Sequence, residues 1–198
     1  MSVKSTAVDT SQLDPRERRR ALALAHRSIR HGLERGRPPR LTEESRRGTL
    51  AEERASFVSV RVDGKLNGCI GSLEASRPLA DDVVDNAFKA AFRDPRFAPL
   101  NSSQLEETRL EISVLSPLRR IEIEGEEELV EHLRPGVDGL VLVREGRRGT
   151  LLPSVWDKCP EPARFVALVK KKAGLPVDRW DERIEAYRYT VESFDDAE

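Results

Sequence analysis

The sequence predicts an α+β fold in which antiparallel sheets are flanked by helices. Two segments indicate hairpins: residues 55–62 alternate apolar and polar side chains before Asp63-Gly64, and residues 140–152 form a similar pair around a charged turn. Helical periodicities lie between these hairpins. A hairpin joins antiparallel strands directly, whereas a parallel sheet needs a crossover connection after each strand. The hairpins therefore favour α+β over a doubly wound α/β fold.

Composition excludes several functional classes. The chain has 198 residues, and a core of that size removes roughly 70% of the unfolded surface from water. Its 34 basic and 35 acidic residues give a net charge of -1, which offers no general attraction for nucleic acid or for an anionic membrane. No apolar run approaches the length of a membrane span, and residues 1–6 lack the apolar core of a secretory signal. We therefore expect a cytoplasmic protein.

The cysteines and histidines show no pattern of a metal site. Cys69 and Cys159 lie far apart in sequence, and neither belongs to a CxxC pair. The three histidines, His26, His31 and His132, have no ligand spacing with them. The sequence therefore predicts neither a metal, nor another cofactor, nor a disulfide framework.

The first helix has a clear predicted start. Residues 1–12 are polar and aperiodic, and we expect a disordered tail there. Asp14 then serves as the N-cap, Pro15 occupies the first helical position, and Glu17 follows three residues after the cap. An apolar stripe follows at Leu22, Ala25, Ile29 and Leu33. The many arginines of this helix are expected to face water, an interpretation that we prefer to a nucleic-acid surface.

The first hairpin places Cys69 on one particular face. A three-residue loop at 62–64, with Gly64 in the left-handed position, would align the apolar side chains of Val58 and Val60 with Leu66, Gly68 and Ile70. That register leaves Cys69 on the opposite face of the sheet, with Ser59 and Asn67.

The remaining elements are predicted from residues that start or stop helices and from the spacing of apolar side chains. Leu79 to Ala91 forms a helix whose first turn carries Asp81 and Asp82, and Asp94-Pro95 stops it. The later elements are a strand at 110–115, an acidic helix at 126–133, the second hairpin at 140–143 and 149–152, a helix at 162–172 and a strand at 186–194.

The candidate site centres on a cysteine that lies between two glycines, in the segment Leu66-Asn67-Gly68-Cys69-Ile70-Gly71. Each glycine costs a strand roughly 0.5–1 kcal/mol relative to alanine, so the segment is either a tight structural corner or the mouth of a functional site. A free cysteine is more often a small buried apolar residue than a nucleophile. Reactivity would need a nearby cation, helix N-terminus or histidine.

Two arginines flank the Asp-Pro turn after the second helix. The segment Arg93-Asp94-Pro95-Arg96 has two interpretations of equal weight. It could be a helix exit in which an arginine pairs with the acid, or a loop that holds an anion.

The chain as a whole resembles a known family, the AMME syndrome candidate gene 1 protein family, called AmmeMemoRadiSam system protein A in prokaryotes. The family's Leu-Arg-Gly-Cys-Ile-Gly hexapeptide is matched by residues 66–71. Further matches are residues 91–97, residues 111–116, Gly149-Thr150-Leu151-Leu152-Pro153, and Lys172-Ala173-Gly174-Leu175-Pro176 followed by Trp180. The resemblance implies a single domain over residues 13–195, with a larger lobe holding both termini, a smaller inserted lobe, and a cleft between them near the hexapeptide.

The sequence departs from this family at two positions. Asn67 stands where the family has arginine, and Asp138 stands where it usually has a histidine. Because both changes remove groups that could activate a thiolate, they weaken a Cys-His catalytic mechanism, and we expect no strong activation of Cys69.

Three functions remain open. The first is binding of a small polar ligand or partner in the cleft, with Asn67, Gly68, Cys69, Gly71, Arg93, Arg96 and Asp138 as the candidate contacts. The alternative is a cysteine-dependent enzyme or enzyme subunit, with Cys69 as the candidate catalytic residue, acting with a Memo-like protein and a radical-SAM enzyme as the family name implies. An adaptor or RNA-binding module is weaker, because the sequence lacks an aromatic stacking pattern.

Overall fold

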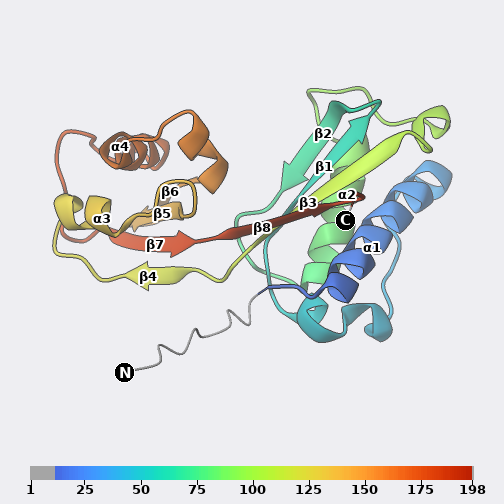
Figure 1. The fold of residues 1–198 in the computed structure, drawn as a ribbon, viewed down its shortest axis with the longest axis horizontal. Coiled ribbons are helices and arrows are strands. Elements are labelled where there is room, and N and C mark those ends of the chain that lie inside the picture. The colour runs from blue at the N-terminus through green and yellow to red at the C-terminus, as the bar shows by residue number, and fades with distance from the viewer. Residues whose placement is uncertain (1–11, 198) are drawn as a thin grey trace, which may run out of the picture. The chain divides into compact units, whose positions relative to one another are not determined.

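A computed structural model describes residues 12–197, and it confirms the α+β class: these residues form four α-helices and two four-stranded antiparallel sheets (Figure 1). Apart from Gln12, the predicted tail lies outside the described residues. The chain divides into two compact units, of which the first runs to Leu115 and resumes at Glu192, and the second comprises Ser116–Val191. No helix within residues 12–197 combines the length and apolar character needed to cross a membrane.

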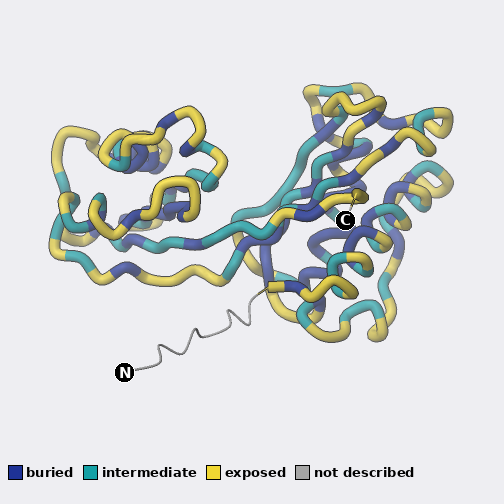
Figure 2. The backbone as a smooth tube through the Cα atoms, viewed as in Figure 1, coloured by how far each residue is buried: buried dark blue, intermediate teal, exposed yellow. Residues whose placement is uncertain are grey.

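The first unit consists of two helices packed on one face of a sheet. Its strands are β1 (Ser56–Val62), β2 (Lys65–Gly71), β3 (Thr108–Leu115) and β8 (Val191–Asp195), in the order β2-β1-β3-β8. The helices α1 (Pro15–Arg35) and α2 (Leu79–Phe92) contact each other, and α2 packs on β1 and β2 while α1 packs on β3. Buried apolar side chains of the two helices and the sheet form one core. Figure 2 marks the buried residues along the backbone in dark blue.

The predicted start of α1 is confirmed. Asp14 Oδ1 accepts hydrogen bonds from the N–H groups of Arg16 at 2.7 Å and Glu17 at 2.8 Å, and Glu17 Oε2 accepts one from the N–H of Asp14 at 3.3 Å. This reciprocal capping box satisfies backbone donors that the first helical turn leaves unpaired. The helix ends at Gly36, whose φ of 68° is in the left-handed region. Two short 3₁₀ helices, Glu43–Arg46 and Gly48–Ala51, follow in the connector.

The loop of the first hairpin has two residues, so the predicted three-residue loop is wrong. Val62 pairs directly with Lys65, and both turn residues have positive φ, 50° at Asp63 and 73° at Gly64. Positive φ at both positions characterises the type I′ turn, whose twist matches that of the two strands it joins. Aspartate tolerates this conformation better than most side chains.

A β-bulge restores the predicted face alignment farther along the same hairpin. Arg61 pairs with Leu66, whereas Val60 pairs with Gly68, so Asn67 is an extra residue on β2. Beyond the bulge, Gly68 and Ile70 share the face of Val58 and Val60 as predicted, because Val58 pairs with Ile70. Leu66 does not join that face, and it is 39% exposed.

A buried carboxylate attaches α2 to β1. Asp82 Oδ2 accepts hydrogen bonds from the N–H and Oγ of Ser56 at 2.8 and 2.7 Å and from Asn86 Nδ2 at 2.8 Å. Asp82 Oδ1 accepts from Ser72 Oγ and from Arg77 Nε, each at 2.9 Å. From the sequence, Asp82 was expected only to favour the helix dipole. In the structure it also connects the helix to the sheet on which it packs.

The second unit has its own sheet and core. Its strands are β4 (Arg119–Ile121), β5 (Gly139–Arg144), β6 (Arg147–Leu151) and β7 (Glu185–Tyr189), in the order β4-β7-β5-β6. The helices are α3 (Glu126–His132) and α4 (Pro162–Lys172), and α4 packs on β5 and β6. In the core, Trp156 stacks on Phe165 with ring centroids 3.8 Å apart, and its Nε1 donates to the Asp138 carbonyl oxygen at 2.7 Å.

The predicted final strand, residues 186–194, is two strands in different sheets. Strand β7 ends at Tyr189 in the second unit, and β8 begins at Val191 and joins the sheet of the first. The interruption at Thr190 carries hydrogen bonds to Ser116: the Ser116 N–H donates to the Thr190 carbonyl at 2.9 Å, and Ser116 Oγ accepts from the Thr190 N–H at 3.0 Å. Strand β4 was not predicted, because three residues are too few to show an alternating pattern.

Candidate functional site

Cys69 lies in β2, at one edge of the first sheet. It pairs with Ser59, and its neighbour Gly68 faces α2, so the Cys69 side chain lies on the sheet face opposite the helix. The side chain is half-buried and forms no disulfide. Cys69 is therefore sheltered without being part of the apolar core.

The Asp-Pro turn covers the exposed edge of β2 at this residue. The backbone N–H of Cys69 donates to Asp94 Oδ2 at 2.9 Å, and its carbonyl oxygen accepts from Arg96 Nη2 at 3.0 Å. Arg96 also holds Asp94 through two bonds, at 2.9 Å from Nε and 2.7 Å from Nη2. These side chains satisfy backbone groups that would otherwise lack a partner strand. Of the two interpretations of this turn, the structure shows the pairing of arginine with the acid.

The two side chains of this ion pair differ in exposure, and each shifts the pKa of the other. The Asp94 side chain is 1% exposed, whereas that of Arg96 is 59% exposed. The hydrogen bonds from Arg96 hold the pKa of Asp94 well below its usual range, against the opposing effect of burial, and the N–H groups of Cys69 and Arg96 lower it further. The hydrogen bond to Asp94 in turn raises the pKa of Arg96.

The two glycines of the hexapeptide have structural roles. A Cβ atom on Gly68 would lie 1.9 Å from the Ala90 carbonyl oxygen of α2, and one on Gly71 would lie 2.2 Å from the Phe57 ring. Both distances are far below van der Waals contact. Glycine is therefore required at these positions by the close approach of α2 and of Phe57.

Asn67, the bulge residue, carries an unpaired donor. Its Nδ2 atom is buried and has no hydrogen-bond partner among residues 12–197. Leaving such a group unsatisfied costs about 1–3 kcal/mol, so native structures rarely do it. The sequence did not predict the burial of this donor, because the bulge that buries it forms only when β2 pairs with β1.

Arg93 lies beside a small hollow on the other side of β2. This hollow, with a volume of about 350 Å³, is lined by Pro38, Ile70, Asp85, Phe88, Lys89 and Arg93. The Arg93 guanidinium lies 5.9 Å from the centre of the Phe88 ring, and Lys89 pairs with Asp85 at 2.7 Å. The hexapeptide thus contributes Ile70 to an apolar floor with a charged rim, which no pattern in the sequence indicates.

A comparison with protein-family models identifies the type of domain that this chain forms. The family model AMMECR1 matches residues 22–194, most of the chain. The chain belongs to the AMMECR1 family. Its resemblance to the AMME syndrome candidate gene 1 family is thereby confirmed.

Relatives of this AMMECR1 chain come from archaea and bacteria. Protein MK0488 of Methanopyrus kandleri is 36% identical over 184 residues, covering 88% of this chain and 86% of the relative. A protein of Thermotoga maritima is 36% identical over 157 residues, covering 77% and 84% respectively. The crystal structure of the uncharacterised protein PH0010 from Pyrococcus horikoshii aligns with a TM-score of 0.72 and 31% identity, covering 88% of this chain and 89% of that one. These similarities show the family and the fold and assign no reaction.

Asp138, the remaining predicted site residue of the AMMECR1 chain, belongs to the second unit. Its carboxylate accepts hydrogen bonds from the Arg134 N–H at 2.9 Å, from Nε at 3.0 Å and from Nη2 at 2.6 Å. These bonds close the turn that contains Gly136, whose φ is 78°. The predicted shared cleft that would join Asp138 to Cys69 stays a prediction.

The histidines of the AMMECR1 chain bond to groups other than Cys69. His26 Nε2 lies 2.8 Å from Asp196 Oδ1, His31 Nδ1 lies 2.7 Å from the Arg37 carbonyl oxygen, and His132 Nδ1 lies 2.8 Å from the Glu128 carbonyl oxygen. Within the described part of the chain, no three His, Cys, Asp or Glu side chains are grouped to hold a metal ion.

Proposed function

We propose that this AMMECR1 protein is a binding module whose site is the β2 edge around Asn67 and Cys69. Its ligand is a small polar molecule that presents a carbonyl or carboxylate oxygen. The observation that carries this proposal is the buried Asn67 Nδ2, which has no acceptor within residues 12–197. A ligand oxygen at that atom would remove the cost of the unpaired donor, about 1–3 kcal/mol.

Arg96 favours a carboxylate over a neutral ligand. Its Nε and Nη2 atoms are bound to Asp94 and to the Cys69 carbonyl, whereas Nη1 makes no hydrogen bond within the described residues. The side chain is 59% exposed, so this donor is accessible from solvent. Hydrogen bonds to an ionised acceptor are roughly twice as strong as those between neutral groups. A carboxylate would therefore form a stronger hydrogen bond with Arg96 than an amide would.

Binding is preferred to nucleophilic catalysis because the described part of the chain gives Cys69 no histidine base. Each of the three histidines has a hydrogen-bond partner elsewhere, as described above. A thiol without a base or a metal depends on nearby positive charge for activation. Here the adjacent cation, Arg96, is paired with Asp94. The cysteine in this proposal contacts the ligand and shapes its site without forming a covalent intermediate.

Nuclear magnetic resonance of the ¹⁵N-labelled protein tests the proposal directly. The probes are acetate, acetamide and inorganic phosphate, each titrated while the side-chain amide signals are recorded. Acetate should shift the Asn67 amide signal with a Kd on the order of 1–10 mM, as expected for a four-atom fragment, and acetamide should bind more weakly. Asn86 is the internal control, because its buried Nδ2 already donates to Asp82 at 2.8 Å.

Two variants separate binding at Asn67 from a general effect of the added salt. In both variants the acetate response is followed at the backbone amide of Cys69, because neither retains the Asn67 side-chain amide. Asn67→Asp replaces the donor by an acceptor and should abolish this response, whereas Asn67→Arg supplies a cation and should strengthen it. Equal shifts at Asn67 and Asn86, or an unchanged acetate response in Asn67→Asp, would refute the proposal. Multiple turnover of an ester substrate by the wild-type protein, lost in Cys69→Ser, would instead support the cysteine-dependent enzyme.

A further inference from the structure

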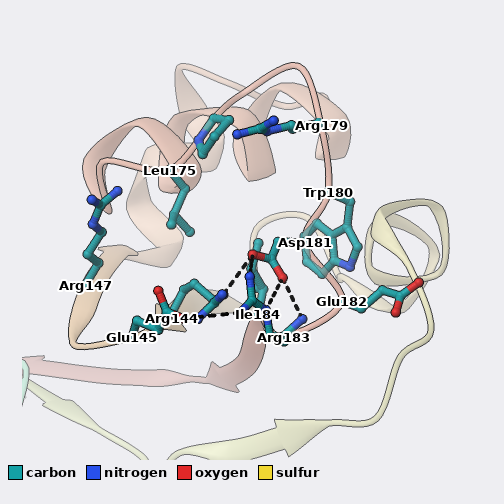
Figure 3. Close-up of a pocket in the computed structure, with 11 residues that line it drawn as sticks. Arg144, Glu145, Arg147, Leu175, Arg179, Trp180, Asp181, Glu182, Arg183 and Ile184 are labelled. Atoms are coloured by element: carbon teal, nitrogen blue, oxygen red, sulfur yellow. Dashed lines mark hydrogen bonds and ion pairs between the residues drawn. The ribbon is translucent and has the colours of Figure 1, made fainter.

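The second unit contains a hollow that none of the preceding functions uses. Its volume is about 700 Å³, within the range of pockets that bind small organic molecules. It lies between the β5–β6 hairpin and the segment 175–184 (Figure 3). Four arginines line it: Arg144, Arg147, Arg179 and Arg183.

Two of these arginines are neutralised within the wall. Arg144 Nε donates to Asp181 Oδ2 at 2.9 Å, and Arg183 Nε donates to Asp181 Oδ1 at 3.1 Å. Glu145 Oε1 is shared by the same two guanidinium groups, at 2.5 Å from Arg144 and 3.3 Å from Arg183. The bonds from Arg183, supported by those from Arg144, hold the pKa of Asp181 far below its usual value. Asp181 is therefore ionised near neutral pH, and the two guanidinium groups face two carboxylates.

The other two arginines have no acidic partner within residues 12–197. Arg147 Nη1 donates to the neutral carbonyl oxygen of Gly174 at 3.0 Å, and Arg179 makes no hydrogen bond or ion pair with the described residues. Figure 3 shows them on either side of Leu175, while the Glu182 carboxylate is directed away from both. The hollow therefore presents two uncompensated positive charges.

The rest of the wall is apolar and aromatic. Leu175 and Ile184 are 8% and 7% exposed and form part of the core of the unit, and the half-buried indole of Trp180 packs against the same core. Leu175, Pro176 and Trp180 are the motif residues near the C-terminal end that carried the family resemblance. An apolar wall beside two free cations suits a ligand that has both an apolar body and a negative charge.

A buried lysine holds this wall in place. Lys170 of α4 is 0% exposed, and its Nζ donates to Glu126 Oε2 at 2.7 Å and to the Val177 carbonyl oxygen at 3.0 Å. The same ammonium lies 5.8 Å from the centre of the Trp180 ring. The segment that carries Trp180 and Arg179 is thus attached to α4 and, through Glu126, to α3. Pre-positioned walls reduce the ordering cost of binding.

We propose that this hollow binds a small organic anion, in which a carboxylate or a phosphate monoester is attached to an apolar or aromatic body. Arg147 and Arg179 hold the anionic oxygens, and Leu175 and Trp180 contact the body. Arginine suits this role because its planar donor group matches the geometry of carboxylate and phosphate oxygens. This site shares no residue with the proposed ligand site at β2.

Tryptophan fluorescence provides a direct readout. The chain has two tryptophans, and Trp156 is 3% exposed, so acrylamide should quench mainly Trp180. Phenyl phosphate and benzoate should protect Trp180 from acrylamide, whereas the neutral phenol should protect it much less. The two anions also distinguish a phosphate ester from a carboxylate as the preferred group. Protection by phenol equal to that by both anions would overturn the proposal.

Arginine variants assign the binding to this hollow. Arg147→Gln and Arg179→Gln should each weaken phenyl phosphate binding about tenfold, as expected for loss of one charge-assisted contact. Arg164→Gln is the matched control: Arg164 is exposed on α4 and does not line the hollow. The ³¹P linewidth of phenyl phosphate gives a second measure that does not depend on tryptophan, and circular dichroism verifies folding. Equal affinity in the wild type and both pocket variants would refute the assignment.

Discussion

The carboxylate of Asp94 accepts a hydrogen bond from the backbone N–H of Cys69 at 2.9 Å, although Cys69 lies in β2 and Asp94 in the turn after α2. Through the same carboxylate, Arg96 is positioned to bind the Cys69 carbonyl oxygen. The edge of β2 is therefore completed by two side chains, and the conformation of the hexapeptide depends on a turn that lies after α2.

Asp94→Asn should destabilise the protein at pH 7 by about 1–3 kcal/mol, because it removes the charge from a buried hydrogen-bonded acceptor. Urea unfolding measures this change. Asp157→Asn is the control, since Asp157 is exposed and makes no ion pair within the described residues. A loss in Asp94→Asn no larger than in the control would show that the ion pair contributes little.

The same variant should also change the acid sensitivity of folding. Because the folded-state pKa of Asp94 is depressed, its stabilising contribution is complete above the unfolded pKa, about 3.9, and is lost as the pH falls toward the folded value. The free energy of unfolding of the wild type should therefore fall more steeply below pH 4 than that of Asp94→Asn. Parallel dependence of the free energy of unfolding on pH in the two proteins would contradict the assigned role of Asp94. Both proteins should still lose some stability in acid, because the pKa of Asp181 is also lowered.

Gly68→Ala should destabilise the fold by about 1–3 kcal/mol, since the added Cβ would meet the Ala90 carbonyl and force α2 away from β2. Thermal and urea unfolding report the change. Gly125→Ala makes a matched control: Gly125 has φ of -165°, and a Cβ there meets nothing within 4 Å. If the two variants were equally stable, the packing explanation for Gly68 would be wrong.

Asp82→Ala should cost about 3 kcal/mol, because it leaves the buried N–H and hydroxyl of Ser56 without their acceptor. The neighbouring Asp81→Ala removes only a partly exposed pair with Arg46 and should cost less than about 1 kcal/mol. Comparing the two free energies of unfolding separates the buried network from a general effect of acidic residues on the helix dipole. Similar losses in both variants would favour the dipole explanation.

Cys69→Ser should leave the fold intact, with a destabilisation on the order of 1 kcal/mol, because the side chain is half-buried and not part of the core. Circular dichroism and urea unfolding measure this. In the wild type, iodoacetamide should modify Cys69 well before Cys159, which is 3% exposed. Loss of folding in Cys69→Ser, or preferential labelling of Cys159, would contradict the described environment.

The sequence by itself determined the elements whose signals are local. The capping box that begins α1 involves only Asp14, Pro15 and Glu17, and the helix of residues 162–172 was predicted with the bounds that the structure has. Such signals involve neighbouring residues, so they are present in the sequence whatever the rest of the chain does. The face occupied by Cys69 was also predictable, because apolar side chains alternate along β1.

Only the tertiary structure placed Asp94 on Cys69, Asp82 under Ser56, and Arg147 in the same hollow as Trp180. The bulge at Asn67 likewise arises from the pairing of β2 with β1. Strands β7 and β8 are separate because they join different sheets. Each of these relationships joins residues that are distant in sequence or depends on a partner strand. Their free energy comes from burial and from hydrogen bonds that exist only when the distant segments meet, so no local pattern of side chains could encode them.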